Sequence, residues 1–348
     1  MGVAIRGIEY YLPEKTVTNE ALAAEFPEWS MEKIQGKTGI LERHIADPCE
    51  CSSDLGYQAA ASLFNSGVCS PGEIDYLLLC TQSPDYFLPT TACLLQDRLG
   101  IPETAGALDF NLGCSGFVYG LGLAQGLIRT AQASRVLLIT AETYSKFIHP
   151  RDKSVRTLFG DAAAATLVES WSGEEDAAPA PFVFGTNGKG GINLIVPAGG
   201  FRTPSTPESA LAVIDENGNW RSQDNLFMNG AEIFNFTLSA IPDCVRRLLA
   251  RANRKIEDID LFVFHQANQY MLEHLRKKLR IPQEKFWLCL SHCGNTVSSS
   301  IPIALKHASL EGKLQDRKLV MLVGFGVGYS WGATLLQWPL VGLSAVSR

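Results

Sequence analysis

The sequence has no surplus of basic residues. Its 348 residues contain 30 Lys and Arg against 36 Asp and Glu, which gives a net charge of −6 and a pI near 5.6. This balance excludes a generic nucleic-acid coat, and no nucleic-acid partner is expected. The first eleven residues lack a basic segment followed by an apolar one, so we expect no export signal and a cytoplasmic location.

Long uninterrupted apolar runs are also missing. The most tempting stretch, residues 320–338, carries four glycines, which indicates two buried strands around a turn rather than a membrane span. Its glycine run at 324–328 lacks the GxGxxG spacing and the long following helix of a dinucleotide site. We therefore expect no membrane partner, and a tight turn at 324–328 that offers backbone N–H groups to a nearby site.

The nine cysteines follow no disulfide or metal pattern. They stand at irregular spacings in a chain long enough to bury a large core, which predicts reduced thiols. Cys289, His292 and Cys293 could suggest a metal, but a fourth ligand and a second CxxC-like pair are absent. No metal is expected.

What the chain does have is ample apolar material and an internal echo. With 46% hydrophobic residues and a length beyond a single core, it should form two packed halves. Short apolar runs alternate with helical patterns, as in α/β proteins. Residues 72–80 (GEIDYLLLC) and 257–265 (EDIDLFVFH) are alike, and each precedes a helix that ends in a similar run, at 98–102 (RLGIP) and 278–282 (KLRIP).

The echo predicts two copies of one βαβαβ-type unit that pack as a pseudo-dimer. We assign residues 1–170 to the first half, residues 223–348 to the second, and residues 171–222 to a variable connecting segment. In such an arrangement equivalent strand ends meet at one place, and ligands of open α/β sheets bind beyond the carboxyl ends of the strands.

Cys114 follows a strand and precedes a small-residue helix. The positive end of the helix dipole favours the thiolate form of a cysteine in this position. The neighbouring Gly113 and Gly116 let a substrate carbonyl approach the backbone. We therefore interpret Cys114 as a nucleophile rather than as a small buried hydrophobic residue.

His265 and Asn295 stand at equivalent strand ends in the second half. His265 ends an apolar strand, and Asn295 opens a small-residue helix at the position that pairs with Cys114 in the repeat. Each also has a plain structural interpretation, as a satisfied polar group and as an N-cap respectively. Their place in the repeat favours a catalytic role for His265, and Asn295 could both cap a helix and present donors to an anion.

Six motifs in chain order resemble those of the β-ketoacyl-acyl carrier protein synthase III family, which has the thiolase fold. The resemblance covers nearly the whole chain. It implies an α/β protein in which two duplicated βαβαβ halves form five α-β-α-β-α layers. The motifs are 37–44 (KTGILERH), 113–116 (GCSG), 159–162 (FGDA), 265–268 (HQAN), 294–296 (GNT) and 326–332 (GVGYSWG).

The resemblance implies an acyltransferase that performs a Claisen condensation in fatty-acid or secondary-metabolite biosynthesis. Cys114 would take an acyl group from acyl-CoA or a carrier-protein thioester, with the backbone N–H groups of Cys114 and Val327 as the oxyanion hole. Malonyl-CoA or malonyl-acyl carrier protein would then lose CO₂ while His265 and Asn295 hydrogen-bond its thioester carbonyl. This chemistry requires no metal or redox cofactor.

The resemblance also marks substrate-binding positions: Phe159, Asn268, Lys33, Lys153 and Leu88. Lys33 and Lys153 stand where well-known members carry a Trp and an Arg that clamp the CoA adenine. A Lys cannot replace an aromatic face, so we expect a carrier-protein thioester or an unusual CoA ester as the donor. Members usually form homodimers, and Leu88 replaces a larger aromatic of the acyl-pocket loop, which predicts a primer bulkier than acetyl.

Two alternatives stay open. The chain could pass its acyl group to an oxygen, nitrogen or sulfur nucleophile without decarboxylation. The presence of both His265 and Asn295 speaks against this alternative, since decarboxylation uses the pair. The chain could also be a non-catalytic heterodimer partner, but such a partner would be expected to lose the nucleophile, and Cys114 is present.

Overall fold

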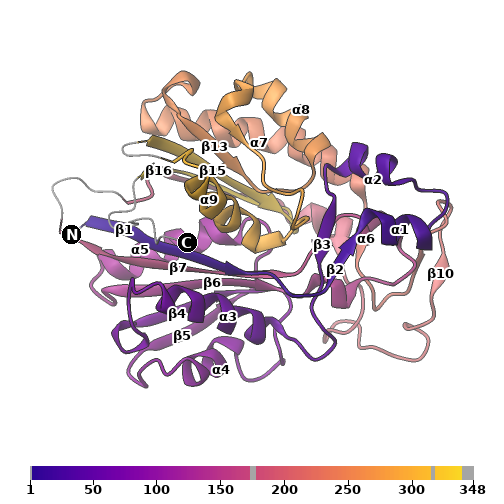
Figure 1. The fold of residues 1–348 in the computed structure, drawn as a ribbon, viewed down its shortest axis with the longest axis horizontal. Coiled ribbons are helices and arrows are strands. Elements are labelled where there is room, and N and C mark those ends of the chain that lie inside the picture. The colour runs from indigo at the N-terminus through magenta and orange to yellow at the C-terminus, as the bar shows by residue number, and fades with distance from the viewer. Residues whose placement is uncertain (1, 173–177, 315–317, 339–348) are drawn as a thin grey trace.

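Two five-stranded mixed sheets form the framework of the computed structural model, which describes residues 2–172, 178–314 and 318–338 (Figure 1). The first sheet has the strand order β1 (Gly2–Tyr11), β7 (Ala162–Trp171), β6 (Arg135–Glu142), β4 (Tyr76–Cys80) and β5 (Gly106–Phe110). The second sheet has the strand order β8 (Phe182–Thr186), β16 (Ser330–Trp338), β15 (Lys318–Gly326), β13 (Leu261–Phe264) and β14 (Phe286–Trp287).

The two sheets share one topology. When the strands of each sheet are numbered in chain order, both sheets have the order 1-5-4-2-3. In both, the 1-5 and 5-4 pairs are antiparallel and the 4-2 and 2-3 pairs are parallel. The duplication is thus confirmed, and the two echo segments form strands β4 and β13, which occupy the same place. Strand β8, at the edge of the second sheet, comes from within residues 171–222.

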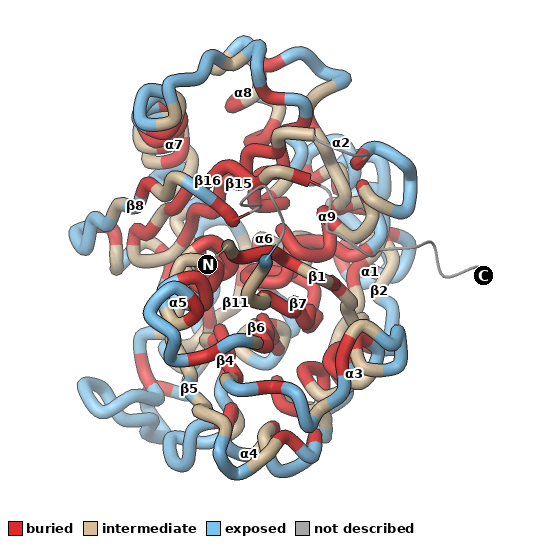
Figure 2. The backbone as a smooth tube through the Cα atoms, turned by 90° about the vertical axis from the view of Figure 1, so that its left-hand side faces the viewer, coloured by how far each residue is buried: buried red, intermediate tan, exposed pale blue. Residues whose placement is uncertain are grey.

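Helices complete the five layers. Helices α5 (Gly116–Arg129) and α9 (Ser300–Leu310) pack between the two sheets in one apolar core. Helices α3 (Ser52–Asn65) and α4 (Thr91–Arg98) cover the outer face of the first sheet. Helices α7 (Gly230–Ala252) and α8 (Gln269–Leu279) cover the outer face of the second. The α-β-α-β-α order is the expected thiolase arrangement, and Figure 2 shows the buried backbone concentrated along its inner layers.

Helix α5 fits between the sheets because small residues line it. A Cβ at Gly120 would lie 2.6 Å from Leu138 Cδ1 and 3.1 Å from Phe110 Cζ, so only glycine allows this approach. The close packing fixes the start of α5, which is the end that carries Cys114.

Smaller elements gather beyond the carboxyl ends of the central strands, at the right of Figure 1. They include β2 (Thr16–Thr18), α1 (Asn19–Glu25), α2 (Met31–Thr38), β3 (Glu42–His44), α6 (Lys153–Arg156), β9 (Leu194–Ile195), β10 (Val213–Ile214), β11 (Trp220–Arg221) and β12 (Phe227–Met228). The described residues also form short 3₁₀ helices, namely η1 (Pro71–Glu73), η2 (Tyr144–Phe147), η3 (Gly188–Asn193), η4 (Ile256–Asp258), η5 (Gln283–Lys285) and η6 (Val297–Ser299).

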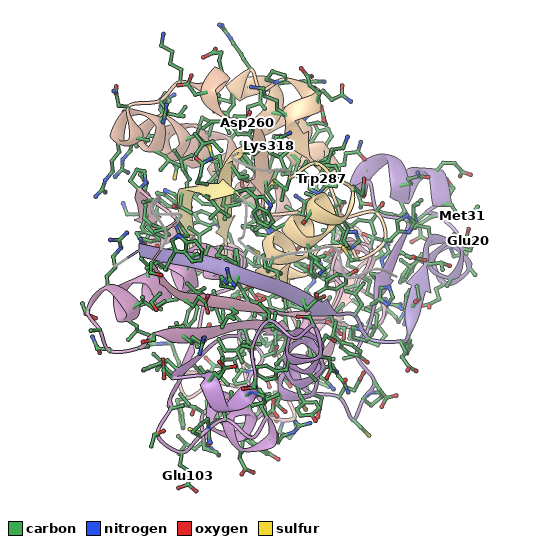
Figure 3. All side chains as sticks on the ribbon, turned by 60° about the vertical axis from the view of Figure 1, so that its left-hand side comes forward. Glu20, Met31, Glu103, Asp260, Trp287 and Lys318 are labelled. Atoms are coloured by element: carbon green, nitrogen blue, oxygen red, sulfur yellow. The ribbon has the colours of Figure 1, made fainter. Side chains whose placement is uncertain are left out.

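At the amino ends of β13 and β15, the second sheet is bounded by a hydrogen bond between β15 and the segment that leads into β13. Asp260 and Lys318, at the amino ends of β13 and β15, lie next to each other in Figure 3. The Asp260 carboxylate accepts a hydrogen bond from the Leu319 N–H at 2.8 Å. Within the described ranges, no helix is long and apolar enough to cross a membrane.

Candidate active site

Cys114 lies at the elbow between β5 and α5, directly before the N-cap residue Ser115. The second half holds this elbow in place. The Ser115 and Ser330 hydroxyls are 2.6 Å apart, and a Cβ at Gly326 would lie 2.9 Å from the Cys114 Sγ. Glycine at 326 therefore lets the end of β15 pass directly over the thiol, which is only 6% exposed.

His265 follows β13 and faces the same point. Its Nδ1 lies 2.7 Å from the Ser300 Oγ at the start of α9, and the Phe325 ring stands edge-on to its imidazole. Burial lowers the pKa of His265 to about 3, although the Val297 backbone acts in the opposite direction. The imidazole is therefore neutral near neutral pH, and Ser300 leaves its Nε2 as the nitrogen for a substrate.

Asn295 reaches the site from the loop before η6. Its backbone is bonded on both sides, because its N–H donates to the Leu158 carbonyl at 2.8 Å and its carbonyl accepts from the Gly160 N–H at 3.0 Å. Its side-chain Oδ1 accepts from the Val297 N–H at 3.0 Å, which leaves Nδ2 as the donor group. The sequence suggested that Asn295 could cap the following helix. It does not cap α9, because η6 intervenes and α9 begins only at Ser300.

The three predicted residues line one cavity. Cys114, His265 and Asn295 come from three separate segments and surround a cavity of about 90 Å³. The rest of its wall is largely apolar, which strengthens electrostatic interactions inside it. Other lining residues are Tyr144, Leu158, Phe159, Leu194, Asn268 and Phe325.

The electrostatic setting of Cys114 has two opposing parts. Burial, and then the charge of Glu142, raise the pKa of the Cys114 thiol, while the backbone N–H of Cys114 lowers it. The predicted effect of the α5 dipole also lowers this pKa. An ionised Glu142 would therefore add to the effect of burial and disfavour the thiolate form of Cys114.

Three other predicted residues lie at or beside the cavity. Phe159 forms part of its wall, and Asn268 lines it while its side chain caps α8 by accepting from the Met271 N–H at 2.9 Å. Val327 packs with Cys114 in one apolar cluster, and the oxyanion role of its N–H stays a prediction.

The remaining predicted residues lie outside the cavity wall. The Lys153 Nζ pairs with the Glu28 carboxylate at 2.6 Å, and the Lys33 Nζ donates to the Glu28 carbonyl at 3.1 Å. The two lysines are thus joined through one residue beside α2. Leu88 is 87% exposed and lines no part of this cavity.

Sequence reasoning missed Glu142, Tyr144 and Ser300. Glu142 ends β6 and is fully buried, and Tyr144 lies two residues later in the cavity wall. The available signal was an acid directly after the apolar run of β6, at the same sheet edge as Cys114. Nothing in the sequence indicated that Ser300 would contact His265.

A larger cleft adjoins the cavity. It has a volume of about 960 Å³ and shares Tyr144 and Leu194 with the catalytic cavity. Val327 lines it too, and the aromatic side chains of Tyr86 and Phe87 stand exposed at its rim. The Tyr144 hydroxyl donates to the Gln82 Oε1 at 2.5 Å and so fixes the wall between the two spaces.

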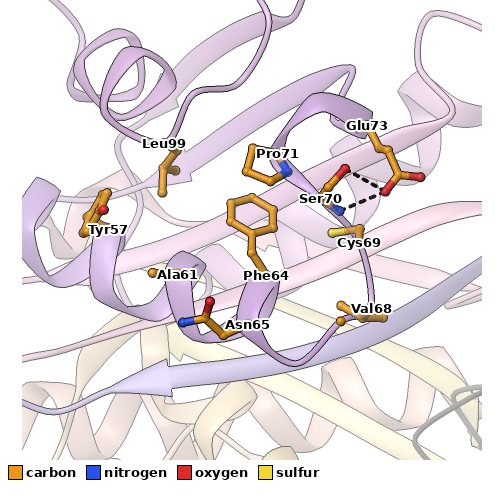
Figure 4. Close-up of a pocket in the computed structure, with 11 residues that line it drawn as sticks. Tyr57, Ala61, Phe64, Asn65, Val68, Cys69, Ser70, Pro71, Glu73 and Leu99 are labelled. Atoms are coloured by element: carbon orange, nitrogen blue, oxygen red, sulfur yellow. Dashed lines mark hydrogen bonds between the residues drawn. The ribbon is translucent and has the colours of Figure 1, made fainter.

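A separate groove between α3 and η1 carries none of the predicted residues (Figure 4). Its volume is about 770 Å³. The Glu73 carboxylate there accepts hydrogen bonds from the Ser70 N–H and hydroxyl, and burial raises the pKa of Cys69 to about 11. With its acid already bonded and its thiol protonated, the groove offers no reactive group.

Metal-ligating side chains do not cluster in the part of the chain that the structure describes, where no group of three or more is found. The Cys293 Sγ contacts the Cys289 carbonyl at 3.2 Å, and the His292 Nδ1 lies 3.1 Å from Glu42. All nine cysteines are free thiols.

A five-layered duplicated fold with Cys, His and Asn around one buried cavity defines a condensing enzyme of the thiolase superfamily. The sequence matches the family described as 3-oxoacyl-[acyl-carrier-protein (ACP)] synthase III over residues 108–188, and the C-terminal part of that family over residues 249–338. The chain belongs to this family, whose members are acyltransferases that act in fatty-acid biosynthesis.

Individual relatives support the same assignment along the whole chain. A β-ketoacyl-[acyl-carrier-protein] synthase III from Caldanaerobacter subterraneus is 36% identical over 97% of this chain and 98% of its own. A crystal structure of a 3-oxoacyl-(acyl-carrier-protein) synthase III is 54% identical, covers 97% of this chain and 100% of its own, and superimposes with a TM-score of 0.96. A 3-oxoacyl-(acyl-carrier protein) synthase from Burkholderia xenovorans is 40% identical, with coverages of 97% and 94% and a TM-score of 0.88.

Proposed function

We propose that this chain joins a short acyl group to a malonyl thioester by decarboxylative condensation, with Cys114 as the nucleophile. The observation that carries the proposal is the convergence of Cys114, neutral His265 and Asn295 on one largely apolar cavity. Two neutral donors opposite a thiol suit an enolate-forming reaction that needs charge stabilisation rather than a strong base.

In the first step the Cys114 sulfur attacks the carbonyl carbon of the acyl thioester. The backbone N–H groups of Cys114 and Val327 stabilise the oxyanion. The bond from the carbonyl carbon to the donor sulfur then breaks, and the donor leaves as a thiol with the proton that Cys114 gives up. A thiolate suits this exchange because it forms and releases thioesters readily.

In the second step a malonyl thioester occupies the same cavity. His265 Nε2 and Asn295 Nδ2 donate to its thioester carbonyl while CO₂ leaves, and the electron pair of the broken C–C bond becomes an enolate. The enolate carbon attacks the acyl carbonyl on Cys114. The Cys114 thiolate leaves, and the product is a β-ketoacyl thioester.

The cavity size favours a short primer. Because one water-sized group needs roughly 10–15 Å³, a cavity of about 90 Å³ accepts an acyl group of a few carbons, which fits a primer somewhat larger than acetyl. The wall formed by Tyr144 and Leu194 separates this space from the larger cleft. Longer chains would have to pass that wall.

Features of the surface support a proposal for the donor and for the assembly. Lys33 and Lys153 are cations beside α2, so we propose that they bind an anionic donor arm, from CoA or a carrier protein, once Glu28 releases them. The exposed Phe87 contacts the exposed Phe201, with Leu88 beside them, and this apolar rim suits a second copy of the chain in a homodimer. Neither step uses a metal or redox cofactor, and we place the reaction in the cytoplasm.

Intact-protein mass spectrometry tests the proposal. The protein is incubated with acyl-CoAs of increasing length, with Cys114→Ala as the control, and malonyl-CoA or malonyl-acyl carrier protein is then added. We expect an acyl adduct that requires Cys114 and is discharged with release of CO₂. An adduct that clears only with amines, alcohols or thiols would replace the proposal by simple acyl transfer. No adduct from any donor would indicate a non-catalytic partner.

A further inference from the structure

Glu142 is a buried acid that neither step of the proposed reaction uses. It ends β6 with its side chain fully buried, and among the described residues no ion pair involves it. A buried charge without a counter-ion is costly, so the carboxyl must be satisfied in another way. Its partners are a backbone N–H and two hydroxyls, which serve a protonated carboxyl as well as an ionised one.

Both carboxyl oxygens are bonded, each to a different half of the molecule. The Gln82 N–H donates to Oε2 at 3.0 Å, and the Ser83 hydroxyl lies 3.3 Å from the same oxygen. The Ser298 hydroxyl lies 2.9 Å from Oε1. Gln82 and Ser83 follow β4 in the first half, whereas Ser298 lies in η6 of the second. Glu142 therefore ties the two halves together at the catalytic edge.

On the second-half side this tie belongs to a row of three consecutive serines. Ser298 bonds Glu142, the Ser299 hydroxyl donates to the Thr140 carbonyl at 3.1 Å, and Ser300 contacts His265. Asn295 is held three residues before the row by the Val297 N–H. Strand β6 thus holds Ser298 and Ser299, and these serines lie between the residue that contacts Asn295 and the serine that contacts His265.

In the first half, the contacts of Glu142 lead through Gln82 to the residues beside Cys114. Gln82, whose N–H bonds Glu142, accepts from the Tyr144 hydroxyl with its side chain, and a Cβ at Gly113 would lie 2.5 Å from its Oε1. The titratable groups that face Glu142 are Cys80 on β4, Cys114 before α5, Tyr144 in η2 and Asp161 before β7. All four are acids, so none of them supplies a positive charge that would stabilise an ionised Glu142.

We propose that Glu142 is a positioning residue that works in its protonated form: it holds Gln82 and Ser298 around the site, and its ionisation suppresses formation of the Cys114 thiolate. In the protonated form Oε2 accepts from Gln82 and Ser83 while the proton on Oε1 is donated to Ser298. In the ionised form Ser298 must donate instead, and a negative charge is added beside the thiol. Burial raises the pKa of Glu142 to about 8, in agreement with a neutral carboxyl at neutral pH.

The inference uses the nucleophilic role of Cys114 from the proposed function, but its test needs no substrate. Iodoacetamide alkylation of Cys114 is followed by peptide mass spectrometry across a pH series, in wild type and in Glu142→Gln. Glutamine copies the protonated carboxyl, because its oxygen accepts from Gln82 while its amide donates to Ser298. Exposed cysteines such as Cys49 are resolved as separate peptides and report the reagent.

At neutral pH we expect the alkylation rates of wild type and Glu142→Gln to agree within about twofold. Above about pH 8 we expect Glu142→Gln to react about threefold faster or more, which corresponds to a Cys114 pKa lower by about half a unit once the repulsion is relieved. Parallel rate curves at all pH values would overturn the proposal. A variant that is tenfold slower at neutral pH would also overturn it, since the ionised carboxylate would then be the working form.

Ser298→Ala separates positioning from charge. It removes one partner of Glu142 and leaves the carboxyl in place, so we expect slower CO₂ release from malonyl thioester. The Ser298 hydrogen bond lowers the pKa of Glu142, so the charge effect on Cys114 alkylation should stay and move to higher pH. A move to lower pH would mean that packing, not the carboxyl charge, sets the reactivity of the thiol. If wild type forms no acyl adduct although both alkylation results hold, the proposed function fails and this inference stands.

Discussion

The two halves of the chain place different side chains on equivalent backbone. Before β4 the Asp75 carboxylate accepts from the Arg135 N–H of β6, and before β13 the Asp260 carboxylate accepts from the Leu319 N–H of β15. Arg135 and Leu319 are therefore equivalent positions. The backbone repeat brings equivalent strand ends to one place, and the side chains that follow decide what chemistry each half contributes.

At the ends of the two strands this equivalence pairs Glu142 with Gly326. Glu142 lies near the Cys114 thiol, whereas Gly326 adds no side chain, and the titratable group of the second half is His265, which lines the cavity with Cys114. Burial raises the pKa of Glu142 to about 8 and lowers that of His265 to about 3, so both groups are neutral between these values. The comparison shows that burial keeps one side chain of each half neutral by opposite routes, because the acid Glu142 stays protonated and the base His265 stays deprotonated.

The largest expected effect tests whether the two halves serve different reaction steps. His265→Ala or Asn295→Ala removes a donor to the malonyl carbonyl, so condensation should fall by about 10²–10³-fold while the acyl adduct on Cys114 still forms. CO₂ release and intact mass measure the two steps separately. Ser300→Ala, which alters only the support of His265, should lose less. Loss of the acyl adduct in Asn295→Ala would show that the halves do not divide the work in this way.

A second prediction tests how closely one half approaches the other. Gly326→Ala places a Cβ 2.8 Å from the Cys114 Cβ and 2.9 Å from its Sγ, so the nucleophile must shift and acylation should fall by tenfold or more, since displacements of about 1 Å can cost about 10²-fold. Gly126→Ala in α5 is the matched control, because nothing lies within 4 Å of its new Cβ. That change should leave acylation intact and stabilise the helix by about 0.5–1 kcal/mol. Equal acylation in both variants would contradict the close approach.

Sequence alone could predict what the repeat and the strand ends determine. The echo of β4 in β13 predicted the duplication, and the position of Cys114 before a small-residue helix predicted that it lies at the catalytic edge. The setting of Lys33 and Lys153 could not be predicted, because Glu28 joins them from a separate turn. The surroundings of each strand-end residue depend on donors that are distant in sequence.

A third, smaller effect concerns the wall of the cavity. Tyr144 follows β6 and Val327 follows β15, and both line the larger cleft. Tyr144→Val removes the aromatic ring from the wall between this cleft and the cavity. It should open the passage from the cavity and allow longer acyl chains onto Cys114, with a gain of roughly 10-fold or more for each methylene that wild type excludes.

Tyr144→Phe serves as the control for this change. It keeps the ring and removes only the hydrogen bond to Gln82, so its chain-length preference should stay close to that of wild type. Acyl-adduct formation with a series of acyl-CoAs measures the preference. A wild-type protein that already accepts long chains as readily as short ones would show that Tyr144 does not close the passage.

The smallest expected effect is on stability, and it has opposite signs in the two halves. The pKa of Glu142 is raised from 4.5 to about 8, so its contribution to stability is complete below pH 4.5 and is lost as the pH rises to about 8. The pKa of His265 is lowered from 6.5 to about 3, so its contribution is complete above pH 6.5 and is lost as the pH falls to about 3.

Urea unfolding at a series of pH values measures both contributions. Glu142→Gln cannot ionise, so its unfolding midpoint should rise relative to that of wild type as the pH increases from 4.5 to about 8. His265→Gln should instead gain on wild type as the pH decreases from 6.5. If the unfolding midpoints of both variants changed relative to wild type in the same direction of pH, the two halves would not keep these side chains neutral by opposite routes. An acid loses its neutral form as the pH rises, whereas a base loses it as the pH falls.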